Sequence, residues 1–329
     1  MTAQTVTEPV TWGFLSTADI NDKLLAGARE SDMLRVVAVA SRDTARAEAY
    51  ARERGIERAH GTYERLLSDP GVEAVYISLP NSMHIEWAIR ALQAGKHVLC
   101  EKPLSRHPAQ VERAIDAAER ERRILMEAFM YRHNPQTARL RQLVDEGAIG
   151  RLRLIRAAFS FGLTDMANVR LAATLDGGGL MDVGCYCISA ARLLAGEPQQ
   201  VYGTQVLSRS GVDELFGGTM RFAGDVVAQF DCGLVMPERD ELEAIGEQGS
   251  LFLDDPWHCT EPVIELRTDR GTEHIALDRA DSYRLQLENM SKAIRGQAKP
   301  LLGRDDALGQ ARAVAALYRS ADTGRPVDL

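Results

Sequence analysis

Short apolar runs alternate with helical segments through the first part of this 329-residue chain. Expected strands are Val10–Leu15, Val36–Ser41, Ala74–Leu79, His97–Cys100 and Ile124–Ala128, and the expected helices between them are Ile20–Glu30, Thr44–Arg54, Tyr63–Ser68, Ser82–Ala94 and Pro108–Arg122. Because these runs are apolar throughout and helices separate them, they predict a parallel sheet that is covered on both faces. Ligands bind such sheets at the carboxyl ends of the strands, so the chemistry is expected in the segments that follow the strands.

The pattern changes near Arg151, after which strands follow one another with few helices. Expected strands are Arg151–Gly162, Gln199–Ser208, Gly217–Phe222, Val226–Cys232, Leu242–Gly246, Ser250–Leu253, Val263–Arg267 and Glu273–Leu277, and expected helices are Leu180–Leu194, Ser282–Arg295 and Arg304–Thr323. Strands without helical crossovers predict a largely antiparallel sheet. The expectation is an α/β protein of two domains, residues 1–131 and 132–329.

Charge and cysteine content narrow the functional classes. Lys and Arg total 39 against 47 Asp and Glu, which gives a net charge of −8 and disfavours nucleic acid or anionic lipid as a partner. No apolar stretch approaches the ~18 residues of a membrane span, and the N-terminal MTAQTVTEPV is unlike a signal peptide. Five cysteines, an odd number, fit reduced thiols, and their spacing predicts no metal site. A cytoplasmic protein without a metal is expected.

The first segment with chemical potential is GFLSTADIN, between an expected strand and an expected helix. A dinucleotide fingerprint would have glycine at the places of Ser16, Ala18 and Asn21. Small side chains still permit close approach of a pyrophosphate to the helix N-terminus, so Ser16, Thr17, Ala18 and Ile20 are candidate cofactor contacts. An ordinary strand-to-helix turn would have the same pattern.

The tip of the second strand indicates which cofactor is used. An acidic residue in the place of Ser41 would bind the ribose hydroxyl of NAD, whereas a hydroxyl followed by Arg42 suits the 2′-phosphate of NADP. Arg46, one helical turn further on, could add a second charge. The alternative interpretation of Arg42 is a simple surface cation.

Two further segments follow strands and complete this edge of the sheet. SLPNSMH turns the chain into a helix, and GKHVLCEKPLS places a lysine at a strand end, where its charge can favour an adjacent oxyanion or phenolate. The candidate contacts from these two segments are Leu79, Pro80, Asn81, His84, Glu101 and Lys102. Taken alone, His84 is better explained as a partly exposed helix residue.

A run of three glycines precedes the helix of LDGGGLMDVGCYCISAARLL. Asp182 and Tyr186 are four residues apart and therefore share one face of that helix. An acid–base pair that follows a glycine turn suits proton transfer. The alternative is that Asp182 satisfies the start of the helix and Tyr186 belongs to the core.

Taken in order, GFLSTADIN, VVAVASRD, VEAVYISLPNSMH, AGKHVLCEKPLS, LMEAFMYRHNPQ, DEGAIGRL and GGGLMDVGCY resemble the glucose–fructose oxidoreductase / inositol dehydrogenase (Gfo/Idh/MocA) family over most of the chain. The resemblance implies an N-terminal Rossmann domain for NAD(P), a C-terminal α+β domain with an open, mostly antiparallel sheet, and homodimers or homotetramers. It also implies that Lys102 is catalytic and that Tyr186 occupies the acid–base position, as in the branch with NADP-dependent sugar oxidoreductases and dihydrodiol dehydrogenases.

The function expected on these grounds is an NADP(H)-dependent oxidoreductase acting on CH–OH groups of a sugar or sugar-like polyol. Tyr186 would transfer the hydroxyl proton, Lys102 would stabilise charge on oxygen, and Asp182 would orient one of them. Further candidate substrate contacts are Arg132, His133, Asn134, Asn168, Arg170 and Asp182.

Two other functions are compatible with the sequence. A trans-dihydrodiol dehydrogenase would need an apolar pocket for an aromatic diol, to which Phe129, Met130 and Phe161 could contribute. A non-catalytic NADP-binding regulator could have the same fold, although the presence of both Lys102 and Tyr186 disfavours it. Turnover of NADPH with a panel of sugars would discriminate among the three.

Overall fold

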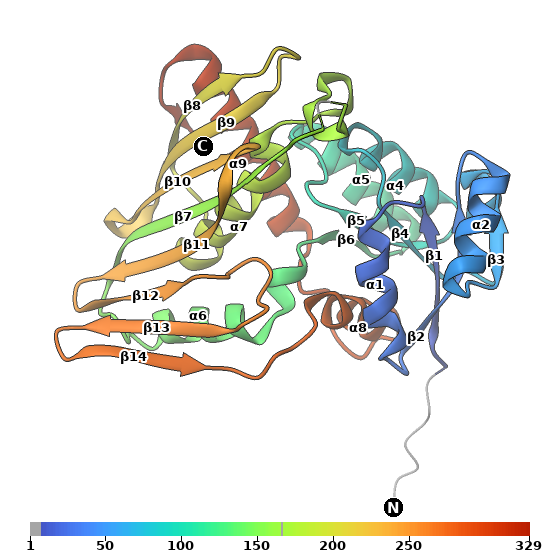
Figure 1. Ribbon diagram of the computed structural model, residues 1–329, viewed down its shortest axis with the longest axis horizontal. Helices are drawn as coiled ribbons and strands as arrows, with labels where there is room; N and C mark the ends of the chain where they lie inside the picture. Colours follow the sequence, from blue (N-terminus) through green and yellow to red (C-terminus); the bar gives the residue numbers. More distant parts are fainter. Residues whose placement is uncertain (1–7, 166) are drawn as a thin grey trace, which may run out of the picture. The chain divides into compact units, whose positions relative to one another are not determined.

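The computed structural model describes residues 8–165 and 167–329, which form two compact units (Figure 1). Of the described residues, unit 1 contains 8–105, 109–130 and 283–307, and unit 2 contains 106–108, 131–165, 167–282 and 308–329. In the described residues, no helix combines the length and the apolar character needed to cross a bilayer.

Unit 1 is built on a six-stranded sheet in the order β3-β2-β1-β4-β5-β6, and every neighbouring pair is parallel. Its strands are β1 (Val10–Leu15), β2 (Leu34–Ala40), β3 (Arg58–His60), β4 (Ala74–Ile77), β5 (His97–Glu101) and β6 (Leu125–Ala128). The helical elements that follow these strands are α1 (Ile20–Arg29), α2 (Thr44–Arg54), α3 (Tyr63–Leu67), η1 (Asn81–Met83), α4 (His84–Gln93) and α5 (Pro108–Glu121). The order reverses between β1 and β4, so the expected Rossmann sheet is confirmed.

Unit 2 contains a nine-stranded sheet in the order β14-β13-β12-β11-β7-β10-β9-β8-β15. Its strands are β7 (Leu152–Gly162), β8 (Gln200–Leu207), β9 (Asp213–Arg221), β10 (Val227–Gly233), β11 (Val235–Gly246), β12 (Gly249–Leu253), β13 (Val263–Thr268), β14 (Gly271–Ala276) and β15 (Val327–Asp328). Among the described pairs, only β7 with β10 is parallel, which confirms the mostly antiparallel sheet. The remaining helical elements of the chain are η2 (Met130–His133), α6 (Pro135–Asp145), η3 (Val169–Leu171), η4 (Ala173–Leu175), η5 (Leu180–Gly184), α7 (Cys185–Ala195), η6 (Ala223–Asp225), α8 (Ser282–Ile294) and α9 (Arg304–Thr323).

The largest difference between the two units and the expected domains concerns residues 283–307. Residues 283–307, which contain most of α8, were expected in the second domain but pack with unit 1. The fully buried Trp12 donates through its indole N–H to the Ser291 hydroxyl at 3.4 Å, and Arg295 pairs with Glu73 at 2.7 Å. These partners lie far apart in sequence, so no local pattern could have shown the return of the chain.

The expected helix Leu180–Leu194 is in fact two elements. It begins with η5, a π-helical turn that carries Asp182, and continues as α7, which carries Tyr186. Gly184 ends the π-helical turn, and a Cβ at that position would lie 2.5 Å from the Cys232 sulfur. π-Helical turns inside helices are frequent at functional sites.

Candidate active site

The turn after β1 is fixed by polar side chains rather than by glycines. Ser16 has φ +141°, a conformation that favours glycine, at the first glycine position of the fingerprint. Its hydroxyl lies 2.7 Å from that of Ser78 and accepts the Ala18 N–H at 3.1 Å. Asn21, fully buried, donates to the Ser16 carbonyl at 2.9 Å and accepts from the Ser78 hydroxyl at 2.7 Å. Asn21 therefore supports the turn from within, and Ser16, Thr17, Ala18 and Ile20 remain half-buried at its surface.

The end of β2 carries two guanidinium groups. Arg42 and Arg46 are both exposed, and neither has an ion-pair partner in the described part of the chain. The buried Ser41 hydroxyl accepts the Asp43 N–H at 3.3 Å, and Asp43 in turn caps α2 by accepting the Arg46 N–H at 3.0 Å. Unpaired guanidinium groups beside a hydroxyl suit a phosphate, since they can donate charge-assisted hydrogen bonds.

Tyr63, the first residue of α3, lies near Arg42 and Arg46, and the sequence did not predict it as a site residue. Burial raises the pKa of its phenol, while the charges of Arg42 and Arg46 and a hydrogen bond from Arg42 act in the opposite direction. Its ring packs edge-on against Trp87 with the centroids 4.9 Å apart. The phenol is therefore held close to both guanidinium groups, which nothing in the local sequence around Tyr63 indicates.

His84 lies beneath this edge of the sheet, not on its surface. The side chain is fully buried, and its two ring nitrogens lie 2.7 Å from the Leu79 carbonyl oxygen and 2.9 Å from that of Pro103. His84 thus connects the loop after β4 to the loop after β5. The ring nitrogens face carbonyl groups of the protein itself, and a contact of the imidazole with the cofactor stays a prediction.

Lys102 directly follows β5 and is half-buried at the carboxyl end of the sheet. The preceding Glu101 carboxylate accepts the Tyr76 hydroxyl and, at 3.3 Å, the Lys102 N–H. Burial, followed by the charge of Glu101, raises the pKa of Tyr76 well above its ordinary value, so Tyr76 remains a donor. The Glu101 carboxylate is thereby held by the protein and fixes the backbone from which Lys102 projects.

In unit 2, Asp182 and Tyr186 follow the glycine run as expected. Arg170 donates through Nε to the Asp182 carboxylate at 2.6 Å, and its guanidinium lies 5.8 Å from the centroid of the Phe161 ring. The Asn168 amide oxygen accepts the Arg170 N–H at 3.1 Å and so caps η3. Arg170 therefore contacts three other expected residues, Asp182, Phe161 and Asn168. The Asn168 side chain is used to accept a backbone N–H.

Tyr186 is surrounded by aromatic rings and is 6% exposed. Ring centroids of Phe159, Tyr131 and Trp257 lie 5.3, 5.6 and 5.8 Å from its own. Trp257 is fixed by donating its indole N–H to the Ala158 carbonyl at 3.1 Å. Such packing holds the phenol ring in one orientation. Phe159 and Trp257 were not predicted, because their strands and loops meet α7 only in the folded chain.

The segment after β6 supplies structural contacts. Arg132 donates to the Ser189 hydroxyl at 3.3 Å, and burial, followed by the charge of Arg132, lowers the pKa of His133 to about 4. Asn134 is buried and caps α6 by accepting the Gln136 N–H at 2.9 Å. The Asn134 amide is thus used within the fold, and a contact of Asn134 with substrate stays a prediction.

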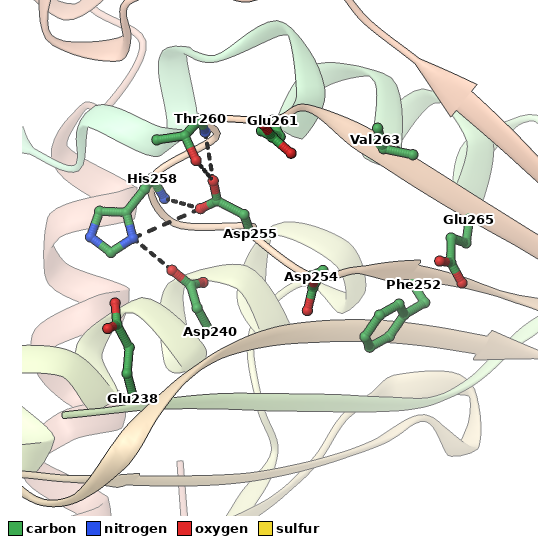
Figure 2. A pocket seen from close by; sticks show the side chains of 10 residues that line it. All are labelled: Glu238, Asp240, Phe252, Asp254, Asp255, His258, Thr260, Glu261, Val263 and Glu265. Carbon is green, nitrogen blue, oxygen red and sulfur yellow. Dashed lines mark hydrogen bonds and ion pairs between the residues drawn. The ribbon is translucent and has the colours of Figure 1, made fainter.

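A cavity of about 570 Å³ lies elsewhere in unit 2, near the loop between β12 and β13 (Figure 2). It contains the one group of metal-ligand type in the residues that the structure describes, Asp240, Asp255 and His258. The atoms of this group already have partners. Asp255 accepts the N–H groups of His258, Cys259 and Thr260, and His258 Nδ1 lies 2.6 Å from Asp240. These bonds shape the loop that carries Trp257.

The doubly wound sheet, the turn after β1 and the residues at its strand ends are those of a dinucleotide-binding oxidoreductase. The comparisons with known proteins agree with this class. The family model described as "Oxidoreductase family, NAD-binding Rossmann fold" matches residues 15–129, and "GFO/IDH/MocA C-terminal domain" matches residues 137–252. The chain belongs to the GFO/IDH/MocA family, which confirms the resemblance.

Three similar proteins show the range of activities among its relatives. D-xylose 1-dehydrogenase (NADP(+)) 2 of Haloferax volcanii is 38% identical and covers 97% of this chain and 99% of its own length. A 3-ketoreductase from Actinomadura kijaniata, solved with NADP and TDP-benzene, is 31% identical with a TM-score of 0.90, over 95% of this chain and 98% of that one. Trans-1,2-dihydrobenzene-1,2-diol dehydrogenase of Danio rerio is 32% identical over 77% of each chain. The first two of these relatives are named with NADP, which confirms the expected cofactor class.

Proposed function

We propose that the protein is an NADP(H)-dependent oxidoreductase that interconverts a carbinol and a carbonyl group on a sugar or sugar-like polyol. The observation that carries the proposal is the presence of both proton-handling groups of the family. Lys102 stands at the carboxyl end of β5, and Tyr186 stands one helical turn after Asp182. The relatives named above act on a sugar, a keto sugar and a diol, which agrees with this substrate class.

The residues at the strand ends of unit 1 fit NADP. The turn at Ser16 would hold the pyrophosphate near the N-terminus of α1. Arg42, Arg46 and the Tyr63 hydroxyl, beside Ser41, would hold the 2′-phosphate, because the two guanidinium groups have no carboxylate partner in the described chain. When bound, the nicotinamide supplies or accepts the hydride.

The chain's own residues manage the proton. The Tyr186 hydroxyl donates its proton to the nascent alkoxide in reduction and removes it in oxidation, and the Lys102 ammonium stabilises the phenolate. Asp182 orients one of these two side chains. The ion pair with Arg170 fixes the position of the Asp182 carboxylate. The Asp182–Arg170 pair offers charged hydrogen-bonding groups, which favour a substrate with several hydroxyl groups. Phe129 and Met130, proposed for an apolar pocket, are buried.

The test is turnover with a panel of sugars and polyols, followed as NADPH absorbance in both directions. Tyr186→Phe should lower kcat by about 10²–10⁴-fold with NADP affinity unchanged, because the transferable proton is lost. Lys102→Met should cause a comparable loss, and the double variant should lose far less than the product of the two.

Tyr131→Phe is the matched control, because it removes a phenol hydroxyl from the same aromatic cluster. It should cost only the hydrogen bond that Tyr131 donates to Ser189 at 2.8 Å. A Tyr186→Phe enzyme within a few-fold of the wild type would assign proton transfer elsewhere. Turnover of trans-dihydrodiols but no sugar would favour the dihydrodiol dehydrogenase instead.

The cofactor preference has its own test. Arg42→Ala should weaken NADP binding at least tenfold, since a charge-assisted contact contributes about 1.5–3 kcal/mol, and should leave NAD binding nearly unchanged. Arg52→Ala, at an exposed position on the same helix α2, is the control. Equal affinity of the unaltered protein for NAD and NADP would contradict the proposed site.

The assembly proposed from the family resemblance is a homodimer or a homotetramer. On β8, the strand next to the two-residue edge strand β15, Tyr202, Val206 and Leu207 are 44%, 51% and 54% exposed. Apolar side chains gathered on one strand favour a surface that another protomer covers. Light scattering at micromolar concentration should show at least a dimer, and a monomer mass would rule the assembly out.

A further inference from the structure

A buried carboxylate lies directly under the start of the helix that carries the proton-transfer residues. Asp213, the first residue of β9, is 2% exposed. One carboxylate oxygen accepts the Leu180 N–H at 2.6 Å, and the other accepts the Tyr318 hydroxyl at 2.8 Å. Leu180 opens η5, so Asp213 satisfies the first backbone N–H of this helical segment from a distant strand.

The glycine run makes room for this carboxylate. Gly178 has φ +125°, and a Cβ there would lie 2.1 Å from Asp213 Oδ1. A Cβ at Gly179 would be in ordinary van der Waals contact with Asp213 Oδ2, at 3.5 Å. A side chain at position 178 would therefore displace the carboxylate, whereas one at position 179 would not. Gly178 is the residue of the run that leaves room for Asp213 beneath the turn.

Backbone hydrogen bonds of the same turn connect the Asp213 carboxylate to the segment that carries Asp182. The Asp182 N–H donates to the Gly178 carbonyl at 2.9 Å, and the Gly178 N–H donates to the Arg170 carbonyl at 2.8 Å. On the far side, Gln310 donates to the Cys185 carbonyl at 2.8 Å. The turn that carries Asp182 and leads into Tyr186 is thus held at both ends by side chains from other elements.

We propose that Asp213 is a positioning residue for proton transfer, acting through Leu180 on the orientation of Asp182 and Tyr186. The proposal rests on the proposed function. It assigns a role to the negative charge of Asp213 as well as to its shape. A charged acceptor binds an N–H about twice as strongly as a neutral one, and the N-terminus of a helix favours an anion.

Charge can be tested because Asp213 titrates in an accessible range. Burial raises its pKa to about 6, while the Leu180 N–H, the Tyr318 hydroxyl and the Arg106 guanidinium act in the opposite direction. The Cys232 thiol on β10 also interacts electrostatically with Asp213, and Arg106 is itself paired with Asp176 at 2.9 Å. Lowering the pH through 6 should therefore weaken the bond to Leu180 without changing the sequence.

The experiment compares the wild type with Asp213→Asn and Tyr318→Phe in the full-length enzyme, measuring kcat, KM and NADP affinity from pH 5 to 9. Wild-type kcat should fall by about three- to tenfold to an acidic plateau, with a midpoint near 6. Asp213→Asn should remain at that plateau at every pH, because its amide oxygen still accepts from Leu180 without the charge. KM and NADP affinity should change less than twofold.

Tyr318→Phe separates positioning from general stability. It removes a hydrogen bond to the charged carboxylate, so the midpoint should move to higher pH while kcat above pH 8 stays within about twofold of the wild type. Asp213→Ala should lower kcat per folded molecule more than tenfold. If that variant does not fold, the other two pH profiles decide.

The outcomes distinguish this inference from the function on which it rests. No NADP(H)-linked turnover by the wild type with any sugar, polyol or diol would refute the proposed function. Wild-type turnover with a kcat and a pH profile that Asp213→Asn leaves unchanged would refute only the role of Asp213. A variant that loses stability but keeps kcat per folded molecule would make Asp213 a structural residue.

Discussion

The turn after β1 and the turn before α7 both lead the chain into a helix that is central to the proposed chemistry, and they do so by different means. At the first, Ser16 adopts a glycine-like φ of +141° and is held by the hydroxyl of Ser78 and the amide of Asn21. At the second, Gly177 and Gly178 remain, because the Arg170 carbonyl and the Asp213 carboxylate approach them too closely for a Cβ. A glycine can thus be replaced where only the backbone angle demands it, but not where space does.

The steric half of this comparison gives the largest expected effect. A Cβ at Gly177 would lie 2.3 Å from the Arg170 carbonyl oxygen, which is backbone and cannot turn away. Gly177→Ala should therefore lower the free energy of unfolding by about 3 kcal/mol or more, measured by urea denaturation. Gly217→Ala, where the nearest atom is an ordinary 3.5 Å away, is the matched control in unit 2. Equal stability of both variants would end the steric argument.

The second turn is anchored by an ionisable group and the first is not, so only the second should respond to pH. The folded-state pKa of Asp213, about 6, lies above its ordinary 3.8. Asp213 therefore stabilises the fold most below pH 3.8, and this contribution is lost as the pH rises through 6.

The unfolding free energy of Asp213→Asn, relative to the wild type, should accordingly rise by about 2–3 kcal/mol between pH 4 and 8. Denaturant titrations at several pH values measure this difference. If the difference in unfolding free energy does not change with pH, the pKa of the Asp213 carboxyl is not raised in the folded state. The two turns would then not differ in their response to pH.

The first turn should depend most on its buried amide. Asn21→Ala leaves the Ser16 carbonyl and the Ser78 hydroxyl without their buried partner, at a cost of about 2 kcal/mol in unfolding free energy at every pH. Asp19→Ala, in the same turn but exposed and without a side-chain capping bond, should change stability by less than about 0.5 kcal/mol. Similar losses for both variants would show that the network contributes little.

The smallest effect is expected where glycine is restored. Ser16→Gly relieves backbone strain of about 1 kcal/mol but loses the bonds of the hydroxyl to Ser78 and Ala18, which contribute a similar amount. The free energy of unfolding should change by less than about 1 kcal/mol, and NADP affinity by no more than a few-fold, by titration. A large gain in stability would mean that the hydroxyl network is only a response to the strain.

The two turns also show what could be predicted from the sequence. Strand ends fall where apolar runs stop, so Lys102 and the Ser41–Arg42 pair were found, and helical spacing joined Asp182 to Tyr186. Tyr63, Trp257 and Asp213 were missed because each acts through residues distant in sequence. The backbone bonds of His84 and Asn134 could not be predicted, because a motif does not show whether a polar side chain faces a ligand or the protein's own backbone.

The return of residues 283–307 to unit 1 determines how this chain can be cut and recombined. A fragment that stops near residue 131 would contain all six strands of the parallel sheet, yet it would lack the segment that carries Ser291 and Arg295. Its Trp12 indole and its Glu73 carboxylate would then face water. An exchange of the dinucleotide-binding part with a relative therefore requires three crossover points, near residues 131, 282 and 307, and residues 283–307 have to be exchanged together with the N-terminal segment.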